Sequence, residues 1–112
     1  MEKLKKYKKI VVQLFEEQAA IRSSRENIET QFNKDEQQNH FQLVNIGWMN
    51  RVRVYGCFLH IDIKPDGKVW LQHDGTDIEV ANILVKRGIP KEDIVLAFHP
   101  ERLRHHTGFA IS

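Results

Sequence analysis

Two side chains with acid-base and metal-binding chemistry lie close together near the middle of the chain. His60 and Asp62 are two residues apart, and Gln72 and Asp74 repeat this spacing on the next segment. A spacing of two places both members of a pair on one face of a β-strand, so the four could form a metal site or an acid-base pair. The chain has no H-E-x-x-H or paired C-x-x-C motif. We therefore favour a hydrogen-bonded polar cluster, and we expect no metal, cofactor or catalytic residue.

A second pattern suggests phosphodiester chemistry. The run from Asp62 to Lys64 matches the D/E-x-K end of the restriction-endonuclease-like core, and Glu29 is a conceivable upstream acid. With His60, these residues would make a metal-dependent phosphodiesterase, in which carboxylates bind Mg²⁺ and the lysine stabilises charge on the attacked phosphate. Three-residue matches are common by chance, and Lys64 adjoins Pro65 at a turn. The phosphodiesterase is therefore an alternative to the polar cluster.

Two aromatic residues share the predicted face of these polar residues. Phe58 precedes His60 by two residues and Trp70 precedes Gln72 by two residues, so each falls on the same strand face as its polar neighbour. Such rings stack on single-stranded bases, but they also occupy the centres of protein interfaces. No lysine or arginine accompanies them on this face, so we predict an interface with a partner protein or with a second copy in a homo-oligomer. The predicted interface consists of Phe58, His60, Asp62, Trp70, Gln72 and Asp74.

A β-hairpin must position these residues. From Arg53 to Ile63, residues of an apolar face alternate strictly with residues of a second, mixed face. Pro65-Asp66-Gly67 has the composition of a three-residue turn. The register that this turn sets predicts four cross-strand pairs: Ile63 with Val69, Asp62 with Trp70, Ile61 with Leu71, and His60 with Gln72.

The same alternation divides the hairpin into two faces. Tyr55, Cys57 and Leu59 fall on the apolar face, which we expect to form the core. Cys57 is the only cysteine, so it has no partner for a disulfide within the chain. We expect its thiol to be buried.

The segment before the hairpin completes an antiparallel meander. Residues 2–20 carry an apolar stripe at helical spacing, and Ser23-Ser24-Arg25 breaks this pattern. Residues 28–33 and 40–48 alternate as strands. Together with the hairpin they predict four antiparallel strands covered by the first helix.

After the meander the pattern predicts a second helix, a fifth strand and a tail. Thr76 followed by Glu79 is a capping box, which predicts that a helix starts there. Residues 94–98 are wholly apolar, as is typical of a short buried strand, and the apolar end of the tail indicates that it docks. We therefore expect one α+β domain over residues 1–112, with a mixed sheet.

Basic residues gather at both ends of the chain, although the net charge is only +2. We favour a solvated surface, because dedicated nucleic-acid binders are far more basic. The alternative is direct DNA binding through Lys5, Lys6, Lys9, Arg102 and Arg104. No apolar run reaches the roughly 18 to 20 residues that span a bilayer, and the charged start lacks a signal-peptide core. We expect a cytoplasmic protein.

The chain also resembles a known family over nearly its whole length. The matching segments begin with the first helix and Ile28-Glu29-Thr30-Gln31. They continue with Val54-Tyr55-Gly56-Cys57, His60-x-Asp62-Ile63-Lys64 and Gly67-Lys68-x-Trp70-x-Gln72-x-Asp74-Gly75-Thr76. It continues through Gly88-Ile89-Pro90-Lys91-Glu92-Asp93-Ile94-Val95-Leu96 to Arg104, Thr107, Phe109 and Ala110. On these residues the sequence resembles the XisI family, the fdxN element excision controlling factor proteins.

The resemblance implies an XisI-like fold and a role in programmed DNA excision in heterocyst-forming cyanobacteria. It implies two partners, a nuclease-like second controlling factor and a site-specific recombinase, and it carries no catalytic residue onto this chain. We therefore expect a non-catalytic accessory factor that acts by binding the second controlling factor. Direct DNA binding and metal-dependent phosphodiesterase activity are the alternatives.

Overall fold

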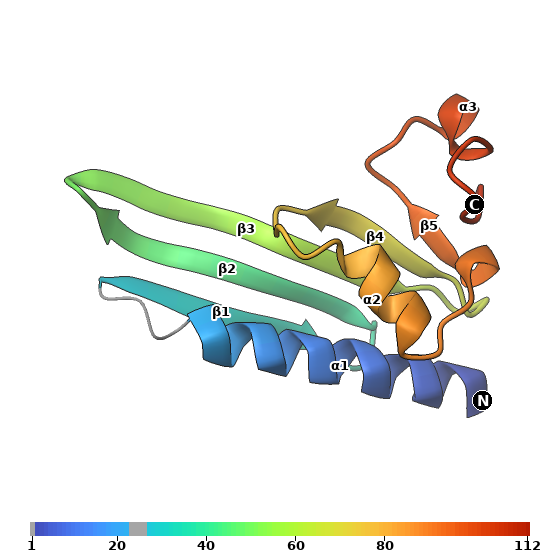
Figure 1. Ribbon diagram of the computed structural model, residues 1–112. Helices are drawn as coiled ribbons and strands as arrows, with labels where there is room; N and C mark the ends of the chain where they lie inside the picture. The colour runs from blue at the N-terminus through green and yellow to red at the C-terminus, as the bar shows by residue number, and fades with distance from the viewer. Residues whose placement is uncertain (1, 23–26) are drawn as a thin grey trace.

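The computed structural model describes residues 2–22 and 27–112, and its elements follow the predicted order (Figure 1). They are α1 (Glu2–Arg22), β1 (Ile28–Asp35), β2 (His40–Met49), β3 (Val52–Ile63), β4 (Val69–Asp74), α2 (Val80–Lys86), the 3-10 helix η1 (Lys91–Asp93), β5 (Ile94–Leu96) and α3 (Glu101–Arg104). The predicted break at Ser23-Ser24-Arg25 lies outside the described residues. The strand predicted over residues 94–98 ends two residues earlier.

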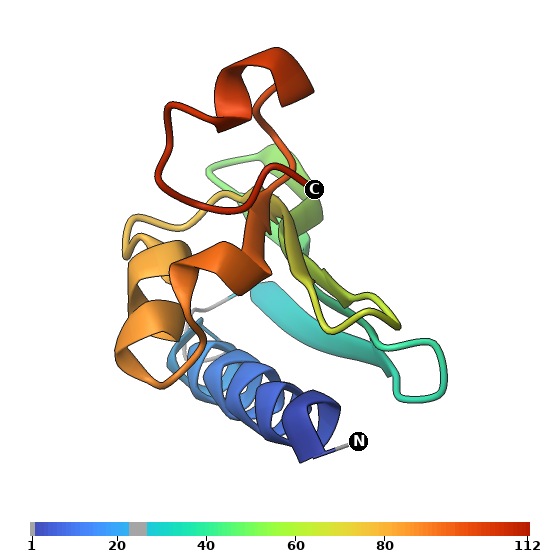
Figure 2. The same ribbon diagram turned by 90° about the vertical axis from the view of Figure 1, so that its right-hand side faces the viewer.

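The five strands form one mixed sheet in the order β1-β2-β3-β4-β5. The first four are antiparallel neighbours, and β5 lies parallel to β4 after the crossover through α2. Both α1 and α2 lie on one side of the sheet (Figures 1 and 2). The predicted α+β architecture is therefore confirmed, and the opposite side, which we call the open face, has neither of these helices over it.

The core lies between the sheet and the two helices. The apolar stripe of α1 buries Val11, Leu14 and Phe15 almost completely. The ring of Phe15 stacks on Phe32 of β1 at 5.2 Å between centroids and lies 6.1 Å from the ring of Phe41 on β2. These contacts bury large aromatic surfaces at the point where α1 crosses the sheet.

A buried polar contact also anchors the first turns of α1. The hydroxyl of Tyr7 donates to the buried carboxylate of Asp93 in η1. Lys3 forms an ion pair with the same carboxylate at 3.0 Å. Burial opposes ionisation of Asp93, but these two partners and the charge of Lys68 outweigh it and hold the pKa of Asp93 below its usual value.

A β-bulge in β3 changes which side chains face the core. Phe58 has no partner on β2, because the pairs on either side of it are Leu43 with Leu59 and Val44 with Cys57. The extra residue shifts the alternation of the strand by one. Phe58 consequently packs against the core, where the guanidinium carbon of Arg22 lies 4.7 Å from its ring centroid.

Three predictions for this strand are therefore wrong. Phe58 does not belong to the polar face, and Cys57 is exposed rather than buried. Tyr55, which was also expected in the core, is 73% exposed. The alternation of apolar residues in the sequence runs unbroken through the bulge, so it carries no sign of the change.

A second irregularity shifts the register between β3 and β4. Three predicted pairs are confirmed: Ile63 with Val69, Asp62 with Trp70, and Ile61 with Leu71. The fourth is wrong, because His60 pairs with His73 and leaves Gln72 as the extra residue. Asp74 pairs with Leu59, whose side chain is in the core. Cross-strand partners share a face, so Asp74 does not lie on the predicted polar face.

Asp74 instead holds the connection to α2, in place of the predicted capping box. Its carboxylate accepts the backbone N–H of Thr76 at 2.9 Å and that of Val80 at 3.0 Å, and the Thr76 hydroxyl also donates to it. The helix begins at Val80 rather than Thr76, and Glu79 makes no capping hydrogen bond through its side chain. A carboxylate from the preceding strand therefore satisfies an N–H that the helix itself cannot.

The C-terminal tail docks on the edge of β5, as predicted. Ala110 forms a parallel bridge with Val95, and its N–H donates to the carbonyl of Ile94 at 2.8 Å. The side chain of Lys68 donates to the carbonyl of Ser112 at 2.8 Å. This pairing occupies the outer edge of β5, which would otherwise be a free strand edge.

Candidate functional site

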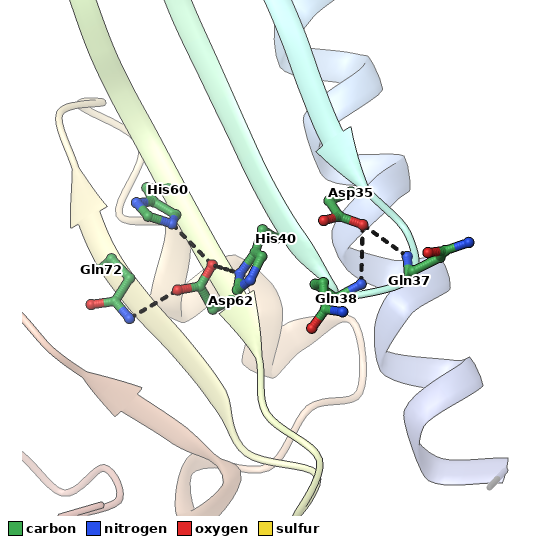
Figure 3. Close-up of polar contacts among 7 residues, drawn as sticks. All are labelled: Asp35, Gln37, Gln38, His40, His60, Asp62 and Gln72. Carbon is green, nitrogen blue, oxygen red and sulfur yellow. Dashed lines mark hydrogen bonds and ion pairs between the residues drawn. The ribbon is translucent and has the colours of Figure 1, made fainter.

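The predicted polar residues meet around one carboxylate on the open face. Asp62 is only 7% exposed. Its Oδ1 accepts hydrogen bonds from His40 Nδ1 at 2.8 Å and from His60 Nε2 at 2.9 Å, and its Oδ2 accepts one from Gln72 Nε2 at 3.1 Å (Figure 3). We call these four residues the Asp62 cluster.

Strand register brings the four residues of the Asp62 cluster together from three strands. His40 lies directly opposite Asp62 on β2, while His60 precedes it by two residues on β3. Gln72 reaches it from the bulged position of β4. Sequence reasoning missed His40. Alternation along residues 40–48 places His40 on the side of β2 opposite to Phe41 and Leu43, but the register of the β2–β3 turn alone would pair it with Ile61, and only the extra residue Phe58 brings it opposite Asp62.

The electrostatics of the Asp62 cluster favour an ionised carboxylate. Burial of Asp62 opposes its ionisation, but the hydrogen bonds from both histidines and Gln72, together with the charge of His60, hold the pKa of Asp62 below its usual value. An ionised carboxylate is only an acceptor, so each histidine donates a ring N–H to it. The cluster is therefore a satisfied hydrogen-bond network, as predicted for His60, Asp62 and Gln72, but with His40 in place of Asp74.

Trp70 lies beside the Asp62 cluster, directly opposite Asp62 on β4. Two cations flank its ring: Lys64 Nζ lies 5.5 Å and the guanidinium carbon of Arg104 lies 5.4 Å from its centroid. The guanidinium of Arg104 also donates to the carbonyls of His99 and Ile111, both at 3.0 Å. Arg104 therefore fixes the tail over the ring, and Trp70 is half-buried in a defined position.

The residues of the alternative phosphodiesterase are not brought together. Asp35 of β1 lies opposite His40, in the row that contains Asp62. Glu29 is six residues away along β1, which places it roughly 20 Å from that row. Lys64 is directed at Trp70. Within residues 2–22 and 27–112, no cluster of three or more His, Cys, Asp and Glu residues has the arrangement of a metal site.

The two basic ends do not form one surface. The first turns of α1 and the short helix α3 lie at opposite sides of the molecule in both views (Figures 1 and 2). Lys5, Lys6 and Lys9 are exposed on α1, and Arg102 is exposed on α3. The guanidinium of Arg104, the fifth candidate for DNA contact, already donates to the carbonyls of His99 and Ile111.

The far end of the open face is apolar, which sequence reasoning did not predict. Tyr55 of β3 and Trp48 of β2 are 73% and 55% exposed. The guanidinium carbon of Arg53, opposite Trp48, lies 5.5 Å from the indole centroid. The bulge at Phe58 is responsible, because it turns Tyr55 and Cys57 from the helix side to the open face. The open face therefore has a polar end at the Asp62 cluster and an apolar end at the β2–β3 turn.

None of the helices in the described part of the chain is long and apolar enough to cross a membrane.

Comparison with known proteins identifies the class to which this fold belongs. The family model for the XisI protein matches residues 1–111, so the chain belongs to the XisI family. A search of curated proteins gave no match.

Two solved structures from Anabaena variabilis ATCC 29413 have this fold. One is a XisI-like protein that is 39% identical, with a TM-score of 0.89, and the match covers 97% of this chain and 99% of that one. The other is the fdxN element excision controlling factor XisI, which is 28% identical, with a TM-score of 0.84, and this match covers 98% of this chain and 99% of that one.

Proposed function

We propose that this protein is a non-catalytic controlling factor for excision of a DNA element, and that it acts by binding a partner protein through the polar end of its open face. Membership of the XisI family and similarity to an fdxN element excision controlling factor support the role in excision. The partner is the nuclease-like second controlling factor that the family resemblance implies.

The observation that carries this proposal is the ordered polar surface around Trp70 on a sheet face that α1 and α2 leave uncovered (Figure 2). Binding hot spots are commonly aromatic residues held in place by their neighbours, because little conformational entropy is then lost on binding. Trp70 is held by Lys64 and Arg104, and the neighbouring Asp62 carboxylate has all its partners within the chain. A partner therefore meets a preformed surface with no unpaired buried charge.

The test is capture of the purified second controlling factor by the wild-type protein and by Trp70→Ala. We expect at least a roughly 30-fold loss of affinity, the size of a typical hot-spot effect. Ile21→Ala, which truncates an exposed apolar side chain on α1, is the matched control and should bind normally. Circular dichroism establishes that each variant is folded.

A second variant separates loss of the interface from loosening of the tail that Arg104 holds over Trp70. Gln42 lies opposite His60 on the open face and is not a member of the Asp62 cluster. Gln42→Lys adds a long charged side chain to the face without removing any contact in Figure 3. Normal capture by both Trp70→Ala and Gln42→Lys would exclude this face as the binding surface.

Direct DNA binding has less support, because its candidate residues lie on opposite sides of the molecule and Arg104 is already engaged. It makes a distinct prediction nevertheless: binding to duplex DNA at low salt that weakens steeply as salt is added. Replacement of Lys5 and Lys9 by glutamate should abolish that binding. Under our proposal the same double variant captures the second controlling factor as well as wild type does.

A further inference from the structure

A cavity of about 490 Å³ lies where the end of α1 meets the connection between β4 and α2. Gln18, Ile21 and Arg22 of α1 line one wall, and residues 75–78 line the other. The volume of this cavity is within the range of small-molecule sites. The cavity lies on the helix side of the sheet and shares no residue with the Asp62 cluster.

The α1 wall of this cavity continues the core stripe of the helix with polar residues. The stripe buries Val11, Leu14 and Phe15 against the sheet. Gln18 follows them at helical spacing and is only 9% exposed. Arg22 lies one turn further along the same side of the helix. Core positions of a helix are normally apolar, so two polar side chains at the end of this stripe need a different explanation.

The side-chain amide of Gln18 lacks a hydrogen-bond partner. No group within residues 2–22 and 27–112 donates to this amide or accepts from it, although the residue is nearly buried. An amide offers two N–H donors and a carbonyl acceptor, and buried groups of this kind are normally hydrogen-bonded. Because Gln18 lines the cavity, its amide is available to a molecule bound there.

The guanidinium of Arg22 also lacks an acceptor. Its carbon lies 4.7 Å from the centroid of the Phe58 ring, and its Nε is buried with no hydrogen-bond partner. No carboxylate in the described part of the chain forms an ion pair with it. The bulge at Phe58 makes the ring contact possible, because it turns the ring to the helix side. The ring therefore holds a cation that has no counter-charge among the described residues.

The opposite wall is held in place by hydrogen bonds within the chain. The carboxylate of Asp74 accepts the backbone N–H groups of Thr76 and Val80. The N–H of Gly75 donates to the carbonyl of Phe58 at 2.6 Å. A Cβ atom at position 75 would lie only 3.0 Å from that carbonyl oxygen, so the close approach favours glycine. The wall is therefore preformed, which lowers the entropic cost of binding a ligand.

We infer that this cavity binds a small aliphatic carboxylate. The carboxylate of the ligand accepts hydrogen bonds from the guanidinium of Arg22 and from the amide of Gln18, and it supplies the counter-charge that Arg22 lacks. The apolar part of the ligand contacts Ile21 and Ile78, which line the cavity beside these polar groups. A ligand of this class gives partners to both of the unpartnered side chains on α1.

The charges that line the cavity favour a monocarboxylate over a phosphate. Among the described residues of the two walls, Arg22 is the only cation and Asp77 is the only acid. One cation balances one negative charge, whereas a dianion would keep an unbalanced charge and would be repelled more strongly by Asp77. The side chain of Asp77 is exposed, so it can stay in solvent when a monoanion binds.

Titration of the protein with isocaproate, followed by amide NMR spectra, tests the site directly. Isocaproate should shift the signals of Gln18, Arg22 and residues 75–78 until they saturate. Isocaproamide has the same shape without the charge, and inorganic phosphate has charge without the apolar part, so both should leave these signals in place. Equal binding of isocaproamide or phosphate would overturn the inference, as would the absence of saturable shifts with isocaproate.

Two variants separate binding from folding. Arg22→Met keeps an unbranched side chain beside Phe58 but removes the cation, and it should weaken isocaproate binding by about tenfold or more. Gln18→Leu should also weaken binding, yet it should raise the urea midpoint of the free protein, because it removes an unpartnered amide from the core stripe. Gln13→Leu, at an exposed position of α1, is the matched control and should change neither property. An Arg22→Met variant that binds as tightly as wild type, or a Gln18→Leu variant less stable than wild type, would contradict the proposal.

Discussion

Replacement of Asp62 by asparagine should destabilise the protein by about 1 to 2 kcal/mol at neutral pH. The carboxylate is nearly buried and accepts three hydrogen bonds. Asparagine keeps the shape and one acceptor oxygen, but it loses the charge and presents N–H groups to neighbours that also donate. The His40 side chain is 50% exposed and can turn to water, so the loss is smaller than for three fully buried bonds to a charge.

Acid should remove this difference between the wild-type protein and Asp62→Asn. The folded-state pKa of Asp62 lies below its ordinary value of 3.8, so its stabilising contribution is complete above that value and is lost as the pH falls through the folded pKa. The difference in unfolding free energy should therefore be present in full at neutral pH and should shrink below about pH 4.

Urea unfolding followed by circular dichroism at pH 7, 5 and 3 measures this difference. Asp77→Asn changes an exposed carboxylate outside the Asp62 cluster, and it should stay within about 0.5 kcal/mol of wild type at each pH. An Asp62→Asn variant as stable as wild type at pH 7, or a difference that persists in full at pH 3, would refute the reasoning.

Two further predictions concern the anchors of the helices. Asp74→Ala should cost about 1 kcal/mol or more, because Thr76 and Val80 lose the acceptor of their backbone N–H groups; amide exchange should quicken at the start of α2 and not in α1. Tyr7→Phe should cost about 1 to 2 kcal/mol, since Asp93 loses the hydroxyl donor and keeps Lys3; an unchanged urea midpoint would contradict this.

The sequence was sufficient to predict the architecture because hydrophobic patterning and turn chemistry agree along most of the chain. The stripe of α1 and the turn Pro65-Asp66-Gly67 fix the first helix and the central register, including the contact of Asp62 with Trp70. The polar cluster followed from the same register. The predicted cluster did not include His40, because the position of His40 depends on pairing with a residue more than 20 positions away in the sequence.

The two bulges account for most of the errors at the site. Bulges at Phe58 and Gln72 move residues between faces, and the sequence signals neither: apolar alternation continues through Phe58, and only polar residues, His73 and Asp74, follow Gln72 in β4. Burial of Cys57 and the placement of Phe58 and Asp74 were wrong for this reason. The start of α2 was wrong because the carboxylate of Asp74, from the preceding strand, acts as the acceptor for its first N–H group, and no local motif signals this.

The most direct test of the proposed function is the solution mass of this protein mixed with the second controlling factor, measured by light scattering on a sizing column without DNA. We expect a peak whose mass equals the sum of the two proteins, and its loss when Trp70 is replaced by alanine. Two separate peaks with unchanged masses would contradict control of excision through partner binding.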